Sequence, residues 1–438
     1  MKKIVFIGAG SVVFTRNLVR DILTFPAFWH DFTIALVDID EEKLTYATKA
    51  VEKIVAASGH QVNIVSTKDR TEALKGADGV LCTICVGGID IWGKDLEIPM
   101  KYGIDMNIGD TRSVSGIFRA LRTFPVMMEI CRDIEKYCPD AVFLNYTNPM
   151  AILCRGMQSE TNVKVTGLCH SVQQTSEMLA RWIGADYNEV TYTCAGINHQ
   201  AFYIDFRVNG KDAYPRIRKA AEEHYNEEIV RNEMLKHLGY YVTESSGHAS
   251  EYVSWFRKRP DLIEKYCLPG TGWNPGIHFA GKEDMKKREL TWRQEFLEWA
   301  DNPVNLERGN EYAAYIFNAV FGDGTLYKFN GNVRNFGLID NLPEGCCVEV
   351  PVLASPAGFE PIHVGKLPEP LPLLIGTSAR VEELAVEGMI HGEPEKIYQA
   401  CYFDPLCAAV LSLEEIRSMV REMFEANREY LPQFKHFS

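Results

Sequence analysis

Short apolar runs alternate with longer segments of mixed polarity along the first half of the chain. The apolar runs predict strands at residues 3–7, 33–38, 63–67, 79–85, 141–146 and 164–169. Between them, apolar residues recur at helical spacing, as at Leu44, Ala47, Val51 and Ile54. Strands that alternate with helices are typical of a parallel sheet with crossover helices, so we expect a doubly wound α/β fold for residues 1–195.

The pattern changes after about residue 195. We expect a strand at 201–208 and two long polar helices at 212–237 and 283–300. Two connections rich in glycine and proline follow at Pro269–Gly272 and Pro368–Pro372, and a final helical segment at 377–430. Residues 196–438 are therefore predicted to form a second, α+β domain that carries the substrate, metal and oligomerisation surfaces.

A glycine-rich turn joins the first predicted strand to the first helix. Gly8 and Gly10 let the backbone bend sharply and approach a pyrophosphate, whose charge would lie at the helix N-terminus beside Ser11. The third glycine of the usual fingerprint is absent, because Val13 takes its position. Asp38 ends the second strand, where it could bind a ribose diol and repel a 2′-phosphate. These features predict a Rossmann-like NAD site; the alternative is a turn that binds nothing and an aspartate that caps the next helix.

Composition narrows the class of protein. The chain has 438 residues, of which 46% are hydrophobic, and 46 basic against 59 acidic residues give a formal charge of −13. Without a basic run, neither nucleic acid nor an anionic membrane is an expected partner. No stretch approaches the roughly 18 apolar residues of a membrane span. The 12 cysteines do not suggest a disulfide framework, so we expect a cytoplasmic enzyme that acts on a small molecule.

Cys169 and His199 are the candidate metal ligands. Each ends an apolar run, and a thiolate with an imidazole can hold a divalent transition metal while leaving positions open for substrate oxygens. From the pattern alone, a buried thiol and a hydrogen-bonded core histidine are the commoner explanation. Asn148, before Pro149, could offer its amide to a sugar hydroxyl or could be a turn residue.

Five separated segments resemble glycoside hydrolase family 4 and, within it, the NAD- and manganese-dependent α-galactosidases (melibiases). They are Asn145–Ala151, Gly167–Gln173, Cys194–His199, Gly239–Ser246 and Gly331–Asn335, and the similarity continues through Leu338–Val350. The resemblance implies that NAD removes a hydride from sugar C3, a base takes the C2 proton, the aglycone leaves, water adds and the hydride returns. It also implies a homodimer or homotetramer. For the second domain we expect an α+β arrangement like the C-terminal region of lactate and malate dehydrogenases.

The resemblance also implies roles for individual residues. Cys169 and His199 would bind Mn²⁺ or another divalent transition metal, and Asn148 would contact the substrate. His170 stands where phosphoglycosidases of the family have an aspartate that protonates the leaving group, so an unphosphorylated substrate is expected. Asp110 matches an acid that raises the proton affinity of the base; alternatively, it is an ordinary loop aspartate.

The identity of the base is the most open assignment. In other branches of the family, a tyrosine aligns near Ser245. Four residues close to this position along the chain are candidates, namely Tyr241, His248, Glu251 and Tyr252. We favour Tyr252 slightly. His248 and Glu251 could instead orient the metal site.

One segment departs from the melibiase pattern. Those enzymes tend to have a Gly-Pro-Gly-Gly loop where this chain has Arg112–Gly116. Arg112 could bind the carboxylate of an anionic sugar, or it could face solvent. The sequence therefore predicts an α-galactosidase-like enzyme, with α-glucosides or α-glucuronides and α-galacturonides as alternative substrates. An NAD-dependent hydroxyacid or polyol dehydrogenase and a non-catalytic sugar or NAD sensor are the rivals from other classes.

Overall fold

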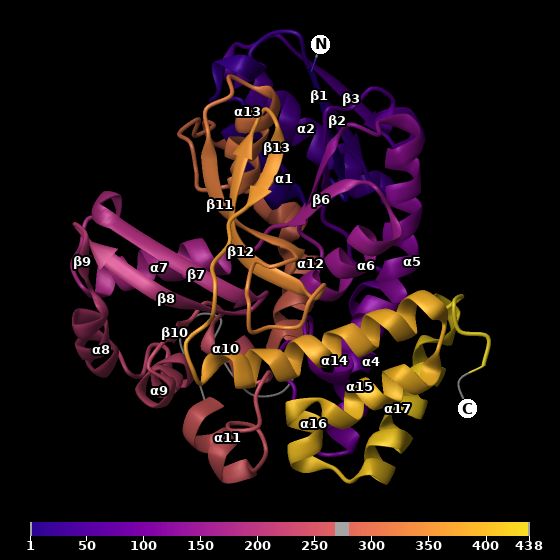
Figure 1. The fold of residues 1–438 in the computed structure, drawn as a ribbon. Helices are drawn as coiled ribbons and strands as arrows, with labels where there is room; N and C mark the ends of the chain where they lie inside the picture. Colours follow the sequence, from indigo (N-terminus) through magenta and orange to yellow (C-terminus); the bar gives the residue numbers. More distant parts are fainter. Residues whose placement is uncertain (1, 268–279, 437–438) are drawn as a thin grey trace.

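The computed structural model describes residues 2–267 and 280–436, and its strands join in one mixed sheet (Figure 1). The described strands are β1 Lys2–Ile7, β2 Phe32–Val37, β3 Val62–Thr67, β4 Gly79–Cys82, β5 Val142–Asn145, β6 Lys164–Gly167, β7 Val190–Ile197, β8 Gln200–Val208, β9 Lys211–Asp212, β10 Tyr241–Val242, β11 Tyr327–Arg334, β12 Cys347–Ser355 and β13 Gly358–Pro361.

The sheet has a parallel half and an antiparallel half. β3, β2, β1, β4, β5 and β6 lie side by side in that order and are all parallel. β11 then pairs with β6 in the opposite direction, and β12, β7, β8 and β10 follow. The Rossmann-like doubly wound prediction is confirmed. The division predicted at residue 195 falls inside β7 and stays a proposal, since strands from both sides of it share the sheet.

Helices cover both faces of the parallel half and form a separate layer at the C-terminal end (Figure 1). The described α-helices are α1 Val12–Ile22, α2 Glu41–Ser58, α3 Arg70–Leu74, α4 Gly88–Lys101, α5 Ser113–Tyr137, α6 Met150–Glu160, α7 Ser171–Trp182, α8 Tyr214–Glu223, α9 Ile229–Leu238, α10 Ser246–Ala249, α11 Pro260–Cys267, α12 Ala280–Asp301, α13 Tyr312–Phe321, α14 Leu371–His391, α15 Pro394–Phe403, α16 Pro405–Val410 and α17 Leu413–Asn427.

Two predicted helical segments are wrong in detail. Residues 212–237 form two helices, α8 and α9, because Asn232 turns its amide back to the carbonyls of His224 and Tyr225 between them. The final segment begins earlier than residue 377 and contains four helices, α14 to α17, since local caps interrupt it. The predicted connection at Pro269–Gly272 lies outside the described residues.

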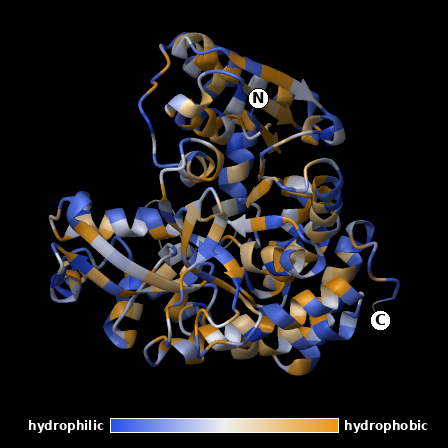
Figure 2. Ribbon diagram, turned by 45° about the horizontal axis from the view of Figure 1, so that its top comes forward, coloured by the Kyte–Doolittle hydropathy of each residue, from blue (hydrophilic) through white to orange (hydrophobic). Residues whose placement is uncertain are grey.

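The parallel strands are buried because helices pack on both of their faces. Every residue of β2 is buried, as expected for a strand of a covered parallel sheet. The helices carry hydrophilic and hydrophobic residues in alternation along their turns, which is the pattern of helices packed on a core (Figure 2). Within the two described stretches, no helix has both the length and the apolar character that a membrane span needs.

The ends of three strands bring the candidate chemistry together. β4, β5 and β6 end earlier than predicted, because the chain leaves the sheet at its carboxyl edge before Asn148 and Cys169. His199 lies in the tight turn that joins β7 to β8. Ligands of open α/β sheets bind at this edge. The fold therefore places the segments that carry Asn148 and Cys169 at one site.

Candidate active site

The turn between β1 and α1 requires its two glycines. Gly8 has φ +86°, and a Cβ atom there would come within 2.0 Å of the carbonyl oxygen of Thr83. A Cβ on Gly10 would lie 2.6 Å from Oδ2 of Asp38, which accepts a 2.7 Å hydrogen bond from the Gly10 N–H. The other oxygen of Asp38 accepts from the N–H of Asp40, and Asp40 is the residue that caps α2. Asp38 therefore fastens the turn to the end of the second strand.

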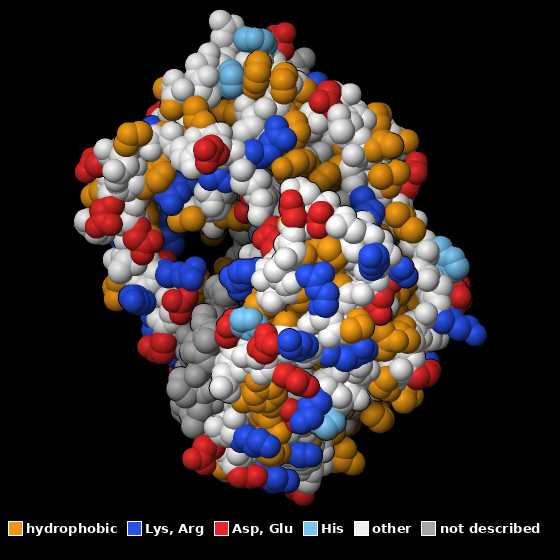
Figure 3. Space-filling view, turned by 90° about the vertical axis from the view of Figure 1, so that its left-hand side faces the viewer, with side chains coloured by type: hydrophobic (Ala, Val, Ile, Leu, Met, Phe, Trp, Pro, Cys, Tyr) orange, Lys and Arg blue, Asp and Glu red, His pale blue; other side chains and the backbone are white. Residues whose placement is uncertain are grey.

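A cleft of about 1090 Å³ opens beside this turn. Gly8, Gly10, Ser11 and Asp38 line one part of it, and residues of α12 line another. Asn148 lines it as well, so the cleft extends from the glycine-rich turn to the carboxyl edge of β5. One face of the molecule is deeply hollowed, with lysine and arginine side chains around the hollow, although the chain as a whole is acidic (Figure 3).

Three side chains converge with metal-ligand spacing. The ligand atoms of Cys169, His199 and Glu244 lie within 4.8 Å of one another, and Nε2 of His199 is 3.2 Å from Oε2 of Glu244. Cys169 follows β6 and Glu244 follows β10. Burial raises the pKa of the Cys169 thiol strongly, and the carboxylates of Glu244 and Glu349 raise it further. A cation among these groups would offset that charge, so the donor set fits a divalent transition metal.

The second ring nitrogen of His199 is also held. Nδ1 lies 3.0 Å from Oγ1 of Thr111 and 3.2 Å from the hydroxyl of Tyr252. Burial lowers the pKa of His199, which favours the neutral imidazole that a metal ligand must be. A fixed outer nitrogen orients the ring of a ligating histidine, and this ring therefore presents Nε2 to Cys169 and Glu244.

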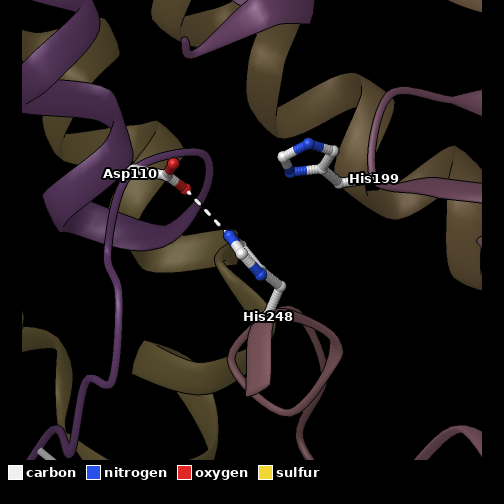
Figure 4. Close-up of side chains that lie close together, drawn as sticks. All are labelled: Asp110, His199 and His248. Carbon is white, nitrogen blue, oxygen red and sulfur yellow. Dashed lines mark ion pairs between the residues drawn. The ribbon is translucent and has the colours of Figure 1, made fainter. Parts of the chain in front are cut away.

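Asp110, His199 and His248 form a second group around the same imidazole (Figure 4). His248 on α10 points its Nε2 toward Oδ1 of Asp110 at 3.7 Å. Asn148 donates to the other oxygen of Asp110 at 3.4 Å. Although burial opposes it, the charge of His248 lowers the pKa of Asp110 below its ordinary value. The predicted Asn148, Cys169 and His199 thus meet around one centre with Asp110.

His170 lies beside this centre and has its own acidic partner. Its Nε2 is 2.7 Å from Oε2 of Glu311, and its ring stacks on Tyr146 with 5.5 Å between ring centres. Burial lowers the pKa of His170, but the hydrogen bond and charge of Glu311 outweigh it and raise the pKa above the ordinary value.

Two sequence models of one known family together match almost the whole chain. A sequence model described as Family 4 glycosyl hydrolase matches residues 3–185, and one described as the C-terminal domain of this family matches residues 194–407. The chain belongs to glycosyl hydrolase family 4. The α-galactosidase of Bacillus subtilis (strain 168) is 38% identical over 99% of this family 4 chain and 100% of its own length. The α-galactosidase of Rhizobium meliloti (strain 1021) is 36% identical over 99% of this chain and 90% of its own length.

More distant relatives have other names. The α-galacturonidase of Thermoanaerobacterium saccharolyticum (strain DSM 8691 / JW/SL-YS485) is 28% identical over 99% of this chain and 97% of its own. Among solved structures, a 6-phospho-α-glucosidase from gut microorganisms in complex with NAD and Mn²⁺ superposes with a TM-score of 0.83 at 19% identity, covering 99% of this chain and 100% of its own. At that identity the likeness supports the fold.

Two of the four candidate bases of this family 4 enzyme are engaged elsewhere. The hydroxyl of Tyr241 is buried and donates to Oδ1 of Asn232. The carboxylate of Glu251 accepts from three successive backbone N–H groups, of residues 107–109, and so holds the loop that carries Asp110. Tyr252 and His248 are the candidates that contact the His199 centre.

Arg112 is buried rather than facing solvent. Its side chain forms an ion pair with Glu382 of α14, and it donates to the carbonyl oxygen of Asn198. Its guanidinium also lies over the ring of Tyr252, 5.3 Å from the centre. The alternative of a solvent-facing arginine is therefore wrong, and the charge that could bind a sugar carboxylate already has an internal partner.

Sequence reasoning missed four glutamates of this site. Glu244 had a signal, because it lies in the segment Gly239–Ser246 that resembles the family. Glu349 had one as well, because it lies in the segment Leu338–Val350 to which the similarity extends. Glu311 and Glu382 had none, since each is far along the chain from the group that it approaches. Glu349 is completely buried beside the side chain of Asn198, and its oxygens make no hydrogen bond of ordinary geometry with the described residues. Burial, together with the charge of Glu244, raises the pKa of Glu349 to about 8.

We predict that Glu349→Gln stabilises the metal-free protein at alkaline pH. The folded protein keeps a proton on Glu349 up to about pH 8, whereas the unfolded chain loses it near 4.5. The free energy of unfolding therefore falls as pH rises through this window, by about 1.4 kcal/mol per pH unit. Urea unfolding with a chelator present should show the variant a few kcal/mol more stable than wild type at the alkaline end and equal to it below the acidic end.

The control is Glu344→Gln, which replaces an exposed glutamate just before the same strand. In this control, the free energy of unfolding should change between the acidic and the alkaline pH by the same amount as in wild type. A Glu349→Gln protein that is less stable than wild type at the alkaline end would mean that Glu349 is ionised in the folded state.

Proposed function

We propose that this chain is an α-galactosidase that uses NAD and Mn²⁺. The observation that carries the proposal is the position of Asn148. It lines the cleft of the glycine-rich turn and also bonds Asp110, within the groups around His199. A sugar held by Asn148 would thus contact both a dinucleotide and a metal. The two relatives that are 38% and 36% identical are α-galactosidases, which favours the same substrate here.

The residues present fit both groups. The close backbone approach at Gly8 and Gly10 and the N-terminus of α1 suit a pyrophosphate. Cys169, His199 and Glu244 would hold the metal. When bound, the dinucleotide supplies an acceptor for a hydride, and the metal supplies positive charge beside the sugar hydroxyls.

The protein's own groups then bind the sugar and move protons. The amide of Asn148 would bind a sugar hydroxyl, with Asp110 fixing its orientation. His170 would give a proton to the oxygen of the leaving group. Asp110, beside the base, would raise the affinity of the base for the C2 proton through its negative charge. Assembly of the enzyme as a homodimer or homotetramer in the cytoplasm stays a prediction.

Tyr252 is the proposed base for the C2 proton. Nδ1 of His199 lies 3.2 Å from its hydroxyl, and the guanidinium of Arg112 lies over its ring, so two nitrogen groups are near a phenolate. Burial raises the pKa of Tyr252 well above its ordinary value, which means that these neighbours and a bound metal must favour the ionised form. His248 is the second candidate, because it pairs with Asp110.

The pairing of Arg112 favours a neutral sugar over a uronic acid. A substrate carboxylate would have to compete with Glu382 for the guanidinium, and burial raises the pKa of Glu382 to about 7 although Arg112 opposes it. A carboxylate gains most from an arginine that lacks another acidic partner. α-Galacturonides therefore rank behind α-galactosides, as do α-glucosides.

The first test is a panel of nitrophenyl glycosides assayed with NAD⁺, Mn²⁺ and a thiol. The α-galactoside should be hydrolysed with a catalytic amount of NAD⁺, at least about tenfold faster than the α-glucoside and the α-galacturonide. NADH formed in proportion to substrate, without release of nitrophenol, would identify a dehydrogenase instead. Binding of sugar or NAD⁺ without turnover would identify a sensor.

The second test measures the metal site without turnover. Glu244→Ala removes a donor, and Cys169→Ser replaces an anionic thiolate by a neutral hydroxyl, so we expect the affinity for Mn²⁺ to fall by at least about tenfold in each. Isothermal titration with Mn²⁺ alone provides the measurement. Glu222→Ala, which removes an exposed glutamate on α8, is the control and should bind as wild type does. Unchanged affinity in the Glu244 variant would restrict the ligands to Cys169 and His199.

The third test identifies the base. Tyr252→Phe keeps the ring that packs under Arg112 but removes the hydroxyl, so turnover should fall by roughly 100-fold or more. Exchange of the C2 hydrogen with D₂O, followed by NMR, should stop in the same variant. His248→Gln should retain measurable exchange. If exchange stops in the His248 variant and continues in the Tyr252 variant, the base is His248.

A further inference from the structure

We propose that Glu311 is a positioning residue that aims His170 at the oxygen of the leaving group. The inference rests on the glycosidase function proposed above and extends it to a residue that no local sequence signal marked. Glu311 immediately precedes α13, 141 positions along the chain from His170. α13 packs against α1, and Phe14 of α1 contacts the ring of His170, so the tertiary packing brings the two side chains together.

The ring of His170 is restrained on several sides. Nε2 lies 2.7 Å from Oε2 of Glu311, which fixes how the ring is turned in its own plane. One face stacks on Tyr146, with 5.5 Å between ring centres and 29° between planes. Phe14 of α1 meets the ring edge to face at 6.1 Å and packs against Tyr146 at 4.7 Å. Nδ1 is the nitrogen that no described residue hydrogen-bonds, so it is the one left to face a substrate.

The position of Glu311 is itself enforced by α1. Asp21 is completely buried, and its carboxylate accepts from the backbone N–H groups of Gly309 at 2.8 Å and of Glu311 at 3.3 Å. Arg20 pairs with the same carboxylate at 2.7 Å. A Cβ on Gly309 would come within 2.3 Å of the Arg20 guanidinium and 2.9 Å of Oδ2 of Asp21, so a side chain there would disturb this ion pair. The helix that begins at the glycine-rich turn therefore also holds the partner of His170.

This arrangement assigns each nitrogen one task. Nε2–H donates to the carboxylate of Glu311, and Nδ1–H, which no described residue accepts, would donate to the oxygen of the leaving group. When the base takes the C2 proton, the electrons of that C–H bond form the C1–C2 double bond. The electrons of the C1–O bond go to the leaving oxygen, which takes the proton from Nδ1. The products are a neutral alcohol and a neutral imidazole that still donates to Glu311.

A merely structural role for Glu311 predicts a different dependence on the leaving group. An alkyl alcohol is a poor leaving group and needs a proton as the C1–O bond breaks, whereas dinitrophenolate leaves without one. Loss of the orienting carboxylate should therefore slow the first substrate and spare the second. Loss of folding would slow both equally.

The experiment compares kcat on methyl and dinitrophenyl α-galactosides with NAD⁺ and Mn²⁺ present. For Glu311→Ala we expect a loss on the order of 100-fold with the methyl galactoside and less than about threefold with the dinitrophenyl galactoside. Glu311→Gln, which can still accept from Nε2–H, should recover part of the loss. Asn310→Ala is the matched control, because it changes the residue before Glu311 and removes only a hydrogen bond from the Asn310 amide to Glu177. This variant should turn over both substrates as wild type does.

Three outcomes overturn the role of Glu311: equal losses on both galactosides, no loss on either, or a selective loss that Asn310→Ala also shows. Failure of the proposed function gives a different result: the wild-type enzyme would hydrolyse neither galactoside. A wild type active on both substrates therefore leaves only Glu311 in question.

Discussion

The fixed position of the His199 imidazole is the constraint on which the rest of the site depends. Its Nε2 edge meets Glu244 and Cys169, and its Nδ1 edge meets Thr111 and Tyr252. The residue has φ +62°, a left-handed conformation that costs a non-glycine residue about 1–3 kcal/mol. The pairing of β7 with β8 on either side of the turn holds it there. Four segments of the chain are thus brought to one ring.

Several acidic side chains lie close to this ring. Glu244, Glu349 and Glu382 are carboxyl groups in or beside the site, and Arg112 is the buried cation that contacts one of them. Burial therefore raises the pKa of Glu349 and of Glu382, because an ionised carboxylate in a low dielectric needs a partner. A divalent cation among Cys169, His199 and Glu244 would relieve part of this cost. The electrostatics of the protein and the requirements of a metal site agree.

The continuous sheet joins the cleft beside the glycine-rich turn to the centre around His199. β6 carries Cys169 from the parallel half, and β11 and β12 attach the antiparallel half directly to it. Two long-range ties reinforce this connection. Asp21 of α1 holds the segment before α13, and Glu382 of α14 holds Arg112 at the start of α5. The groups beside the cleft and those around His199 are therefore attached to a common framework.

The sequence by itself determined the features that depend on neighbouring residues. Apolar periodicity predicted the six parallel strands and β8, but not the other strands of the antiparallel half. The Gly8 and Gly10 turn followed from backbone geometry, and the motifs around Asn148, Cys169 and His199 indicated the family. These signals are short-range, because they arise from side-chain alternation and local backbone conformation.

Only the tertiary structure decided which distant groups meet. Glu311 reaches His170, Glu382 pairs with Arg112, Glu349 is completely buried, and the hydroxyl of Tyr241 bonds Asn232. The break between α8 and α9 likewise depends on one side chain folding back. Such contacts join residues far apart along the chain, so they are set by how helices and strands pack against each other, and local pattern carries no record of that packing.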